Sequence, residues 1–378
     1  MRMKRILRAV TTSAFAASFM IPSATFAQSV AATTQGTDKA PKLDKNGKPK
    51  EAKAKRGVMT FFDRTNEAPP LAITLTTNIK KIRGDKGDKV PWRNGTLKYT
   101  GADGKEVVVP IQLKTRGIWR QHHCDFPPVR FNFNRETVRN TVFTGMNRPK
   151  LVSYCRNDDT YEQYVLQEYQ LYRIYNMMTP NSHRARLVKM TYADESGKVE
   201  ATRSAIILEE PEELANRLNT KLIKEIGAGP DFMEPFHNAL VGFFEYFIGN
   251  TDFSIFALHN IELLAQPDGN VIPVPMDFDF SGVVGARYAT PDEKLSISSV
   301  HQRLYRGYCG PDSEYVKVAN LFKQKKDSIY ALYSDPIGKL MKKDQVDQTL
   351  HYYDDFYKTI NDPKAMKREM IQQCVSGR

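Results

Sequence analysis

Four polar residues that suit a site for metal and phosphate lie in two short segments of the second half of the chain. Asp252 and Asn260 lie in GNTDFSIFALHN, and Asp277 and Asp279 lie in PMDFDF. Carboxylates flanked by Phe, Met and Val are costly to bury unless an arginine, or a metal with a phosphate, neutralises them. Asn and Asp oxygens are ligands that Mg²⁺ and Mn²⁺ prefer. We therefore predict a metal site at Asn260, Asp277 and Asp279, with Asp252 beside it.

The elements around these residues explain how they meet. IELLA and VIPVP read as two strands joined by a glycine turn at PDGN, so they form a hairpin. A hairpin places the start of one strand beside the end of the other, which brings Asn260 to Asp277. Alternation along a strand puts Asp277 and Asp279 on the same face. Asp252 follows an apolar helix that is expected to end at Gly249–Asn250.

The first half of the chain reads mainly as strands, with one helix. The expected strands are 72–82, 95–117 with a hairpin turn at 101–105, 127–134, 148–155, 184–194 and 201–210, and the expected helix is 157–178. From Pro211 onward the chain is mainly helical apart from the acidic hairpin. This order is typical of a two-lobed nucleotide-binding fold with a cleft between the lobes, and we expect lobes at 58–210 and 211–378.

The N-terminal segment has the pattern of a secretory signal peptide, cut after Ala27. The four basic residues of this segment lower the net charge from +12 to +8 when they are removed. Residues 28–57 are rich in Lys, Pro and Gly, and we interpret them as a disordered tether rather than a ligand for anionic envelope polymers. No later apolar run approaches the roughly 20 residues that span a bilayer. We expect a secreted or periplasmic protein without a transmembrane segment and without a nucleic-acid partner.

Four cysteines in an exported chain favour two disulfides. We favour Cys124–Cys155 and Cys309–Cys374, because each of these bridges stays within one half of the chain. A metal site at HHC (122–124) is the less favoured interpretation, because two adjacent histidines on a strand point in opposite directions.

Several segments, in order, resemble the secreted kinase-like family typified by the spore coat protein CotH. They cover roughly residues 70 to 285 and read LKTRGIWR, PPVRFNF, a helix with a central Glu, RARLVKMTY, AIILEE, GNTD, HN and PMDFD. The resemblance implies an α+β, two-lobed protein-kinase-like fold with a strand-rich N-lobe and a mainly helical C-lobe. It also implies Asp252 as the catalytic Asp, Asn260 as a metal ligand, and a metal-binding Asp at 277 or 279.

The same resemblance assigns further roles around ATP. A basic residue on the third strand is expected to reach the phosphates, and Arg130 is the best positional match, with Lys114 and Arg116 as rivals. Glu168 is the helix carboxylate expected to hold that basic residue. Glu209, at the crossing between the lobes, is expected to hold the adenine through its backbone.

We therefore expect an exported, metal-dependent kinase that transfers a phosphoryl or nucleotidyl group from ATP to a protein or an envelope component. The alternative is a catalytically inactive binding or scaffold protein, favoured by the seven residues between Asp252 and Asn260. A third interpretation takes DFD as the D-x-D motif of a glycosyltransferase.

Purely structural interpretations of these motifs also stay open. DFD can be a strand end paired with Arg287 or Arg303, and GNTD can be a helix cap followed by an Asx turn. The loop after DFD, with Arg306 as a third arginine, can recognise an acidic acceptor. We prefer the interpretation in which a disulfide at Cys309 simply fixes this loop.

Overall fold

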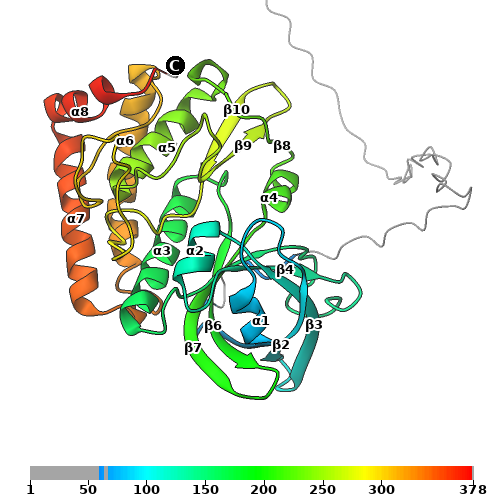
Figure 1. Cartoon of the computed structure of the whole chain (residues 1–378). Helices are drawn as coiled ribbons and strands as arrows, with labels where there is room; N and C mark the ends of the chain where they lie inside the picture. The colour runs from blue at the N-terminus through cyan, green and yellow to red at the C-terminus, as the bar shows by residue number, and fades with distance from the viewer. Residues whose placement is uncertain (1–58, 64–66, 377–378) are drawn as a thin grey trace, which may run out of the picture. The chain divides into compact units, whose positions relative to one another are not determined.

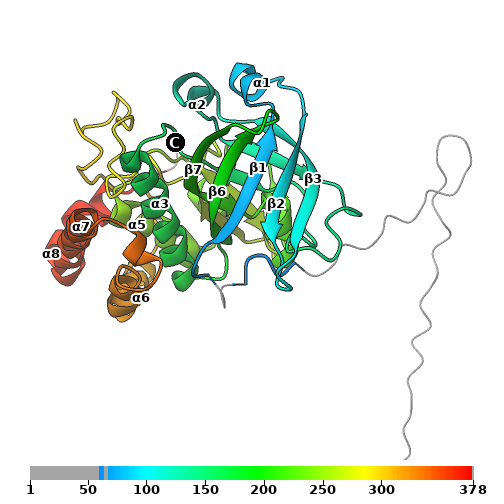
Figure 2. The ribbon, with the colours of Figure 1, turned by 90° about the horizontal axis from the view of Figure 1, so that it is seen from below.

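The computed structural model describes residues 59–63 and 67–376, so the predicted signal peptide and tether lie outside the described residues. Seven strands form one sheet in the first half of the described chain. They are β1 (Leu71–Thr77), β2 (Arg93–Thr100), β3 (Glu106–Thr115), β4 (Val129–Phe133), β5 (Lys150–Val152), β6 (Ala185–Asp194) and β7 (Val199–Leu208). Two short helices, α1 (Ile79–Gly84) and α2 (Ile118–His123), lie at one end of this sheet (Figure 2).

The seven strands close into a barrel in the order β1-β2-β3-β4-β5-β7-β6. Closure comes from β1 and β6, which pair in parallel from Leu71–Val188 to Thr77–Asp194. Every other neighbouring pair is antiparallel. Leu75, Leu97 and Phe131 are fully buried in the barrel interior, as the alternation of apolar residues on these strands predicts.

The expected two-lobed protein-kinase-like fold is wrong. The strand-rich half is a closed, mixed seven-stranded barrel, and a helical region follows it along the chain (Figure 1). The sequence misleads here because alternation shows which face of a strand is buried but not which strand pairs with its edge. The parallel β1–β6 pairing joins residues more than a hundred positions apart, and it leaves the barrel without an open edge.

Two local expectations for the first half are also corrected. The strand expected at 72–82 ends at Thr77, because the Asn78 side chain accepts a hydrogen bond from the Lys81 amide and caps α1. The histidines of HHC lie on α2 and not on a strand, because Gly117 at φ +71° turns the chain out of β3. The hairpin at 101–105 is confirmed as the β2–β3 connection.

The helix expected at 157–178 is α3 (Asp159–Met178), and in both views it lies between the barrel and α7 (Figures 1 and 2). The later helices are α4 (Pro211–Arg217), α5 (Pro235–Ile248), α6 (Asp312–Ala331), α7 (Lys343–Asn361) and α8 (Pro363–Glu369). Short 3₁₀ turns occupy 230–232, 338–340 and 371–373. Tyr169 of α3 and Phe243 and Phe247 of α5 are fully buried in one apolar cluster, so packing against α3 joins the helical region to the barrel.

A small antiparallel sheet completes the second half, in the order β10-β9-β8. Its strands are β8 (Lys221–Ile223), β9 (Ile261–Ala265) and β10 (Val271–Pro275). The hairpin predicted from IELLA, PDGN and VIPVP is confirmed, because β9 and β10 pair from Ile261–Pro275 to Ala265–Val271. This hairpin is the element that carries the acidic residues.

Both expected disulfides are confirmed. Cys124 is bonded to Cys155, and Cys309 is bonded to Cys374. Disulfides persist in oxidising compartments, so the pairing agrees with a secreted or periplasmic location. Among the described helices, none is long and apolar enough to cross a membrane.

Candidate functional site

Asp252 is positioned by the end of α5. Gly249 takes the left-handed conformation at φ +68° and ends the helix, and the Asn250 side chain then accepts a hydrogen bond from the Asp252 amide at 3.0 Å. The local interpretation of GNTD as a helix cap with an Asx turn is therefore correct. This turn also leaves the Asp252 side chain 39% exposed, at the surface of the helical region.

The seven residues between Asp252 and Asn260 form a tight loop that folds back onto Asp252. Ser254 and His259 exchange two main-chain hydrogen bonds, of 2.9 and 3.0 Å, across the loop. His259 Nε2 then lies 2.8 Å from one Asp252 carboxylate oxygen, and Asn260 Nδ2 donates to the other at 3.1 Å. Hydrogen bonding to Asp252 raises the pKa of His259. Asp252 thus meets Asn260 as predicted, and also a histidine that the sequence interpretation did not use.

Asp277 and Asp279 lie in a turn after β10 and not on the strand. Asp277 has a positive φ of 63°, and its amide donates to the Tyr172 hydroxyl of α3 at 3.0 Å. The Met276 amide donates to the Asn260 carbonyl at 3.0 Å, so the hairpin does bring Asn260 beside Asp277. The two Asp residues therefore lie together in one turn, although the strand alternation used to place them together does not apply there.

A cation that the sequence interpretation missed holds this acidic pair. Arg120, on α2, forms a buried ion pair with Asp279, and its Nη2 lies 3.9 Å from Asp277 Oδ1. Burial and the neighbouring Asp277 raise the pKa of Asp279 to about 6 against the opposing effect of Arg120. For Asp277, burial is outweighed by Arg120 and Arg116, and the pKa is lowered. The ion-pair interpretation of DFD is right in kind, but its partner is neither Arg287 nor Arg303.

Glu168 points from α3 toward the same cluster. Its side chain is buried, and Oε1 has no hydrogen-bond partner among the described residues. Burial, followed by Asp279 and Asp277, raises the pKa of Glu168 well above its ordinary value. A buried carboxyl oxygen without a partner is unfavourable, so Glu168 is suited to a ligand or a cation that the chain itself does not supply.

Basic residues form a row across three neighbouring barrel strands. Lys114 of β3 is opposite Arg130 of β4, which is opposite Lys150 of β5, so the three side chains share one face of the sheet. Arg116 lies two residues beyond Lys114, at the end of β3 next to α2. The three predicted phosphate-binding residues are therefore neighbours, together with Lys150, which was not predicted.

Lys150 is the most unusual member of this row. It is only 7% exposed, and its Nζ donates to the Met276 sulfur at 3.3 Å, a weak acceptor. Burial, with the nearby Arg116 second, lowers the pKa of Lys150 to about 8. Arg116 has a buried Nε without a partner among the described residues, and burial lowers the pKa of its guanidinium. Among the described residues, both cations therefore lack a direct anionic partner, and an anion placed between them would supply one.

The neighbouring residues of Lys150 in the sequence could have marked it as a candidate site residue. It begins the short apolar strand KLV, which directly precedes the segment leading to α3 and Glu168. A lone lysine in a fully buried strand needs a partner. The sequence around His259 indicates a role for this residue less clearly. No sequence feature indicates Arg120, because the sequence analysis predicts no helix at α2.

Glu209 does not belong to the cluster. Its carboxylate is fully buried between Arg184 and Arg217, and its main-chain amide donates to the Arg184 carbonyl. Its carbonyl oxygen lies 3.1 Å from His183 Nδ1. All polar groups of Glu209 therefore have partners within the chain, which opposes the predicted contact between its backbone and adenine.

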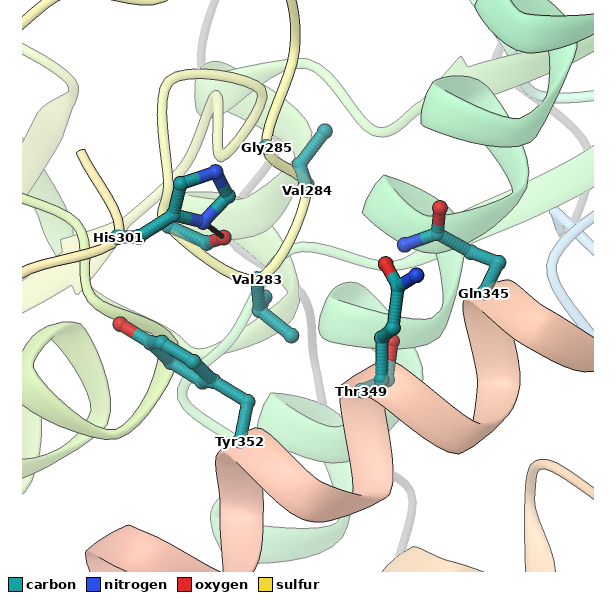
Figure 3. Close-up of a pocket in the computed structure, with 9 residues that line it drawn as sticks. Val283, Val284, Gly285, His301, Gln345, Thr349 and Tyr352 are labelled. Atoms are coloured by element: carbon teal, nitrogen blue, oxygen red, sulfur yellow. Dashed lines mark hydrogen bonds between the residues drawn. The ribbon is translucent and has the colours of Figure 1, made fainter. Parts of the chain in front are cut away.

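The loop after the acidic pair is fixed to the end of α5. The Gly282 amide donates to the Gly249 carbonyl at 2.9 Å, and a Cβ on Gly282 would clash with the Val300 carbonyl oxygen. Figure 3 shows the pocket behind this loop, where His301 Nδ1 bonds to the Gly282 carbonyl and Tyr352 and Thr349 of α7 approach from the other side. None of the residues that line this pocket is Asp, Glu, Lys or Arg, so the pocket holds none of the predicted site residues.

Two of the three arginines of this loop have structural roles. Arg303 donates to the carbonyls of Tyr246 and Phe247 at the end of α5, and it stacks 3.7 Å above the Tyr352 ring. Arg306 donates to the Thr251 carbonyl. These contacts, with the disulfide at Cys309, agree with the interpretation that the loop is fixed in place rather than built around an acidic acceptor.

The carboxyl groups of Asp277 and Asp279 and the buried oxygen of Glu168 are the candidate ligands for a divalent cation at this cluster. In the described part of the chain, no group of three or more His, Cys, Asp or Glu residues could hold a metal ion by itself. Mg²⁺ is commonly held by one or two carboxylates together with substrate phosphates, and Asp277 and Asp279 supply such a pair. The unpartnered oxygen of Glu168 is the observation that favours a missing cation or ligand here.

We compared the chain with models of known protein families and with curated proteins, and none of them matches it.

Proposed function

We propose that this protein is an exported phosphotransferase that uses ATP and a divalent cation to phosphorylate a hydroxyl group. The observation that carries the proposal is the meeting of two sets of residues at one end of the barrel. In the part of the chain that the structure describes, Lys150 and Arg116 have no direct anionic partner, and the carboxyl pair of Asp277 and Asp279 lies next to them. Phosphoryl transfer requires cations on the phosphates, ligands for a metal, and a carboxylate for the attacking hydroxyl, and little other chemistry from the protein.

The basic row supplies the phosphate contacts. Lys150 and Arg116 are the members with incomplete partners, so we assign them to phosphate oxygens. Arg130 and Lys114 lie on the same face of the sheet and add positive charge to the row, and we assign no phosphate oxygen to either of them. Burial strengthens these interactions, because the effective dielectric constant of the interior is lower than that of water.

Asp277 and Asp279 are the residues that would hold Mg²⁺ or Mn²⁺, with the amide oxygen of Asn260 beside them. Such an ion neutralises charge on the phosphates when it is bound. Asn260 has a second role, because its Nδ2 donates to both the carbonyl and the carboxylate of Asp252. It therefore links the acidic pair to the residue that faces the acceptor.

Asp252 is assigned as the base. Its carboxylate is oriented by His259 and Asn260, and it lines a pocket of about 300 Å³ with Phe280, Pro291 and Arg306. An acceptor hydroxyl in this pocket transfers its proton to Asp252 as its oxygen bonds to the γ-phosphorus of ATP. The bond from the γ-phosphorus to the bridging oxygen breaks, and ADP leaves. The segments GNTD, HN and PMDFD, which resemble those of CotH-like secreted kinases, predict the same role for Asp252.

A second function is favoured by one observation. The two central carboxylates are each already held by a basic side chain, Asp279 by Arg120 and Asp252 by His259. A protein that binds a nucleotide or another phosphate compound without transferring it would tolerate both contacts. It corresponds to the inactive binding protein expected as the alternative from the sequence.

The test uses the full chain with both disulfides formed. We expect ATP with Mg²⁺ or Mn²⁺ to raise the melting temperature, and ATP with EDTA to raise it much less. Stabilisation follows RT ln(1 + [L]/Kd), about 2.7 kcal/mol at a hundredfold excess over Kd. Lys150→Met should abolish the shift, and Lys98→Met, on the exposed face of β2, should leave it unchanged.

Release of ADP then separates the two functions. Metal-dependent binding with turnover supports the phosphotransferase, and binding without turnover supports the binding protein. If only a nucleotide sugar stabilises the chain, the glycosyltransferase interpretation of DFD is correct and the present proposal is wrong.

A further inference from the structure

A second pocket adjoins the one at Asp252. Phe253, Ser254 and Arg306 line both pockets, so the two lie side by side along the loop that follows Asp252. We call the pocket at Asp252 the acceptor pocket and its neighbour the apolar pocket. The apolar pocket is lined further by Ile255, Phe256, Tyr308 and Val375.

The apolar pocket has the size and chemistry of a site for one hydrophobic side chain. Its volume is about 200 Å³, and a dry protein cavity of about 150 Å³ can hold benzene. Arg306 is its single charged lining residue, and that guanidinium is already bonded to the Thr251 carbonyl. A leucine or phenylalanine side chain would bury its surface there without removing a free charge from water.

The rim of the apolar pocket is exposed and hydrophobic. Phe256 is 48% exposed and Val375 is 39% exposed, and both line the pocket. Ile226, at 70% exposure, lies beside Phe256, because the Gly227 amide donates to the Phe256 carbonyl. Contiguous exposed apolar residues next to a pocket are typical of a surface that binds a partner.

One wall of the pocket is held rigid by a disulfide. Val375 exchanges main-chain hydrogen bonds with the segment 307–309, at 2.9 and 3.0 Å. The neighbouring Cys374 is bonded to Cys309. The pocket is therefore present before a ligand arrives, and binding need not pay to order this wall.

We propose that the acceptor is a polypeptide that places a hydroxyl side chain beside Asp252 and a nearby hydrophobic side chain in the apolar pocket. This inference rests on the proposed phosphotransferase function and names its acceptor class. A glycan would need several free polar partners, whereas the polar side chains lining this pocket are Ser254 and two that are already bonded, Tyr308 to the Ala228 carbonyl and Arg306 to the Thr251 carbonyl. A lipid chain would need a longer cavity than one that holds a single ring.

The test measures transfer of γ-labelled phosphate to synthetic peptides. Each peptide has one Ser in an Ala and Gly background, with Leu, Phe, Asn or Lys at one of the four positions on either side. We expect Leu or Phe at one particular position to raise kcat/KM about tenfold over Asn, because such a side chain leaves water on entering the pocket and Asn does not gain from this. Equal rates for Leu and Asn at every position would overturn the inference.

Variants locate the effect in the pocket. Phe256→Asp and Val375→Asp should each raise KM for the preferred peptide about tenfold and leave KM for ATP unchanged. Val316→Asp, at 51% exposure on α6, is the matched control and should leave both KM values unchanged. If one pocket variant fails to fold, judged by its melting temperature, the other still decides. Loss of the Leu preference in the control, or its survival in both pocket variants, would contradict the assignment.

Two further outcomes separate this inference from the proposed function. If the chain binds ATP with Mn²⁺ and releases ADP but phosphorylates no peptide, the polypeptide acceptor is wrong and the phosphotransferase stands. If ATP does not bind at all, the proposed function itself is wrong. Sedimentation provides the last check, because a dimer that Phe256→Asp dissociates would assign the apolar pocket to self-association instead.

Discussion

Arg120 and Asp279 form a buried ion pair that joins α2, on the barrel, to the turn after β10. Their side chains are 12% and 6% exposed. The pair links the barrel to the acidic turn, as the contact of Lys150 with Met276 also does, so it helps to set the position of the candidate site as well as its charge. Removing one partner of this buried pair should therefore lower the stability of the fold, whereas removing an exposed charge should not.

We expect Arg120→Met to lower the free energy of unfolding by about 3–5 kcal/mol, because it leaves Asp279 buried without its partner. Asp279→Asn should restore part of this loss in the double variant, since the uncompensated charge is then absent. Urea denaturation of the two single variants and the double variant measures the coupling. Arg287→Met, at an exposed position, is the control. A loss below about 1 kcal/mol in Arg120→Met would contradict the buried pair.

Lys150→Met should stabilise the ligand-free protein. The pKa of Lys150 falls from 10.5 to about 8 in the folded chain, so burial of the ammonium opposes folding by up to about 3 kcal/mol. Between pH 8 and 10.5 the unfolded state binds more protons than the folded state, so wild-type stability rises across this range. The variant should lack this rise. Parallel stability curves for the two proteins between pH 7 and 10.5 would refute the assignment.

Substitutions of Asp252 and Asp277 should have different effects on ATP binding and on phosphoryl transfer. Asp277→Ala removes a metal ligand, so it should weaken ATP binding and abolish transfer together. Asp252→Asn should leave ATP affinity within a few-fold and lower kcat by about 10²–10⁴, the usual effect of a positioned base. Calorimetric titration and labelled transfer on both variants measure the two quantities. If Asp252→Asn loses ATP binding as well, Asp252 does not act on the acceptor.

The ionised carboxylate of Glu162 should stabilise the folded protein at neutral pH but not in strong acid. It lies in the first turn of α3 and accepts hydrogen bonds from Lys189, Arg203 and both the amide and hydroxyl of Ser204. These contacts outweigh burial and lower the pKa of Glu162 from 4.5 to about 2. The stabilisation is therefore complete above pH 4.5 and is lost as the pH falls toward 2.

Glu162→Gln should accordingly cost up to about 3 kcal/mol at pH 7 and almost nothing near pH 2. Chemical denaturation of wild type and variant at several pH values checks this difference. Glu293→Gln, at an exposed position, should change stability little at any pH. A pH-independent loss in Glu162→Gln would mean that packing and not charge explains its effect.

The two disulfides should differ in strength. Replacing either pair by serines should cost about 2–5 kcal/mol. Cys309–Cys374 closes 65 residues and Cys124–Cys155 closes 31, so the chain-entropy model makes the former about 0.7 kcal/mol more stabilising. Guanidinium denaturation of the two double-serine variants compares them. The reverse order would indicate that strain or residual unfolded structure outweighs loop length.

Several features could be predicted from the sequence because they depend on neighbouring residues. The turn at PDGN joins two short apolar strands, so it determines the β9–β10 hairpin and brings Asn260 next to Asp277. Gly249 and Asn250 end α5 and orient Asp252 through local hydrogen bonds. The cysteine pairing followed from keeping each bridge within one half of the chain.

Only the tertiary structure decided the features that depend on distant pairing. Closure of the barrel joins β1 to β6, and alternation within either strand is compatible with many partners. Lys150 and Arg120 reach the acidic turn from β5 and α2, and neither has a local pattern that marks its partner. The physical reason is that turns, caps and alternation arise from contacts within a few residues. The partners of a buried charge are instead set by which elements pack together.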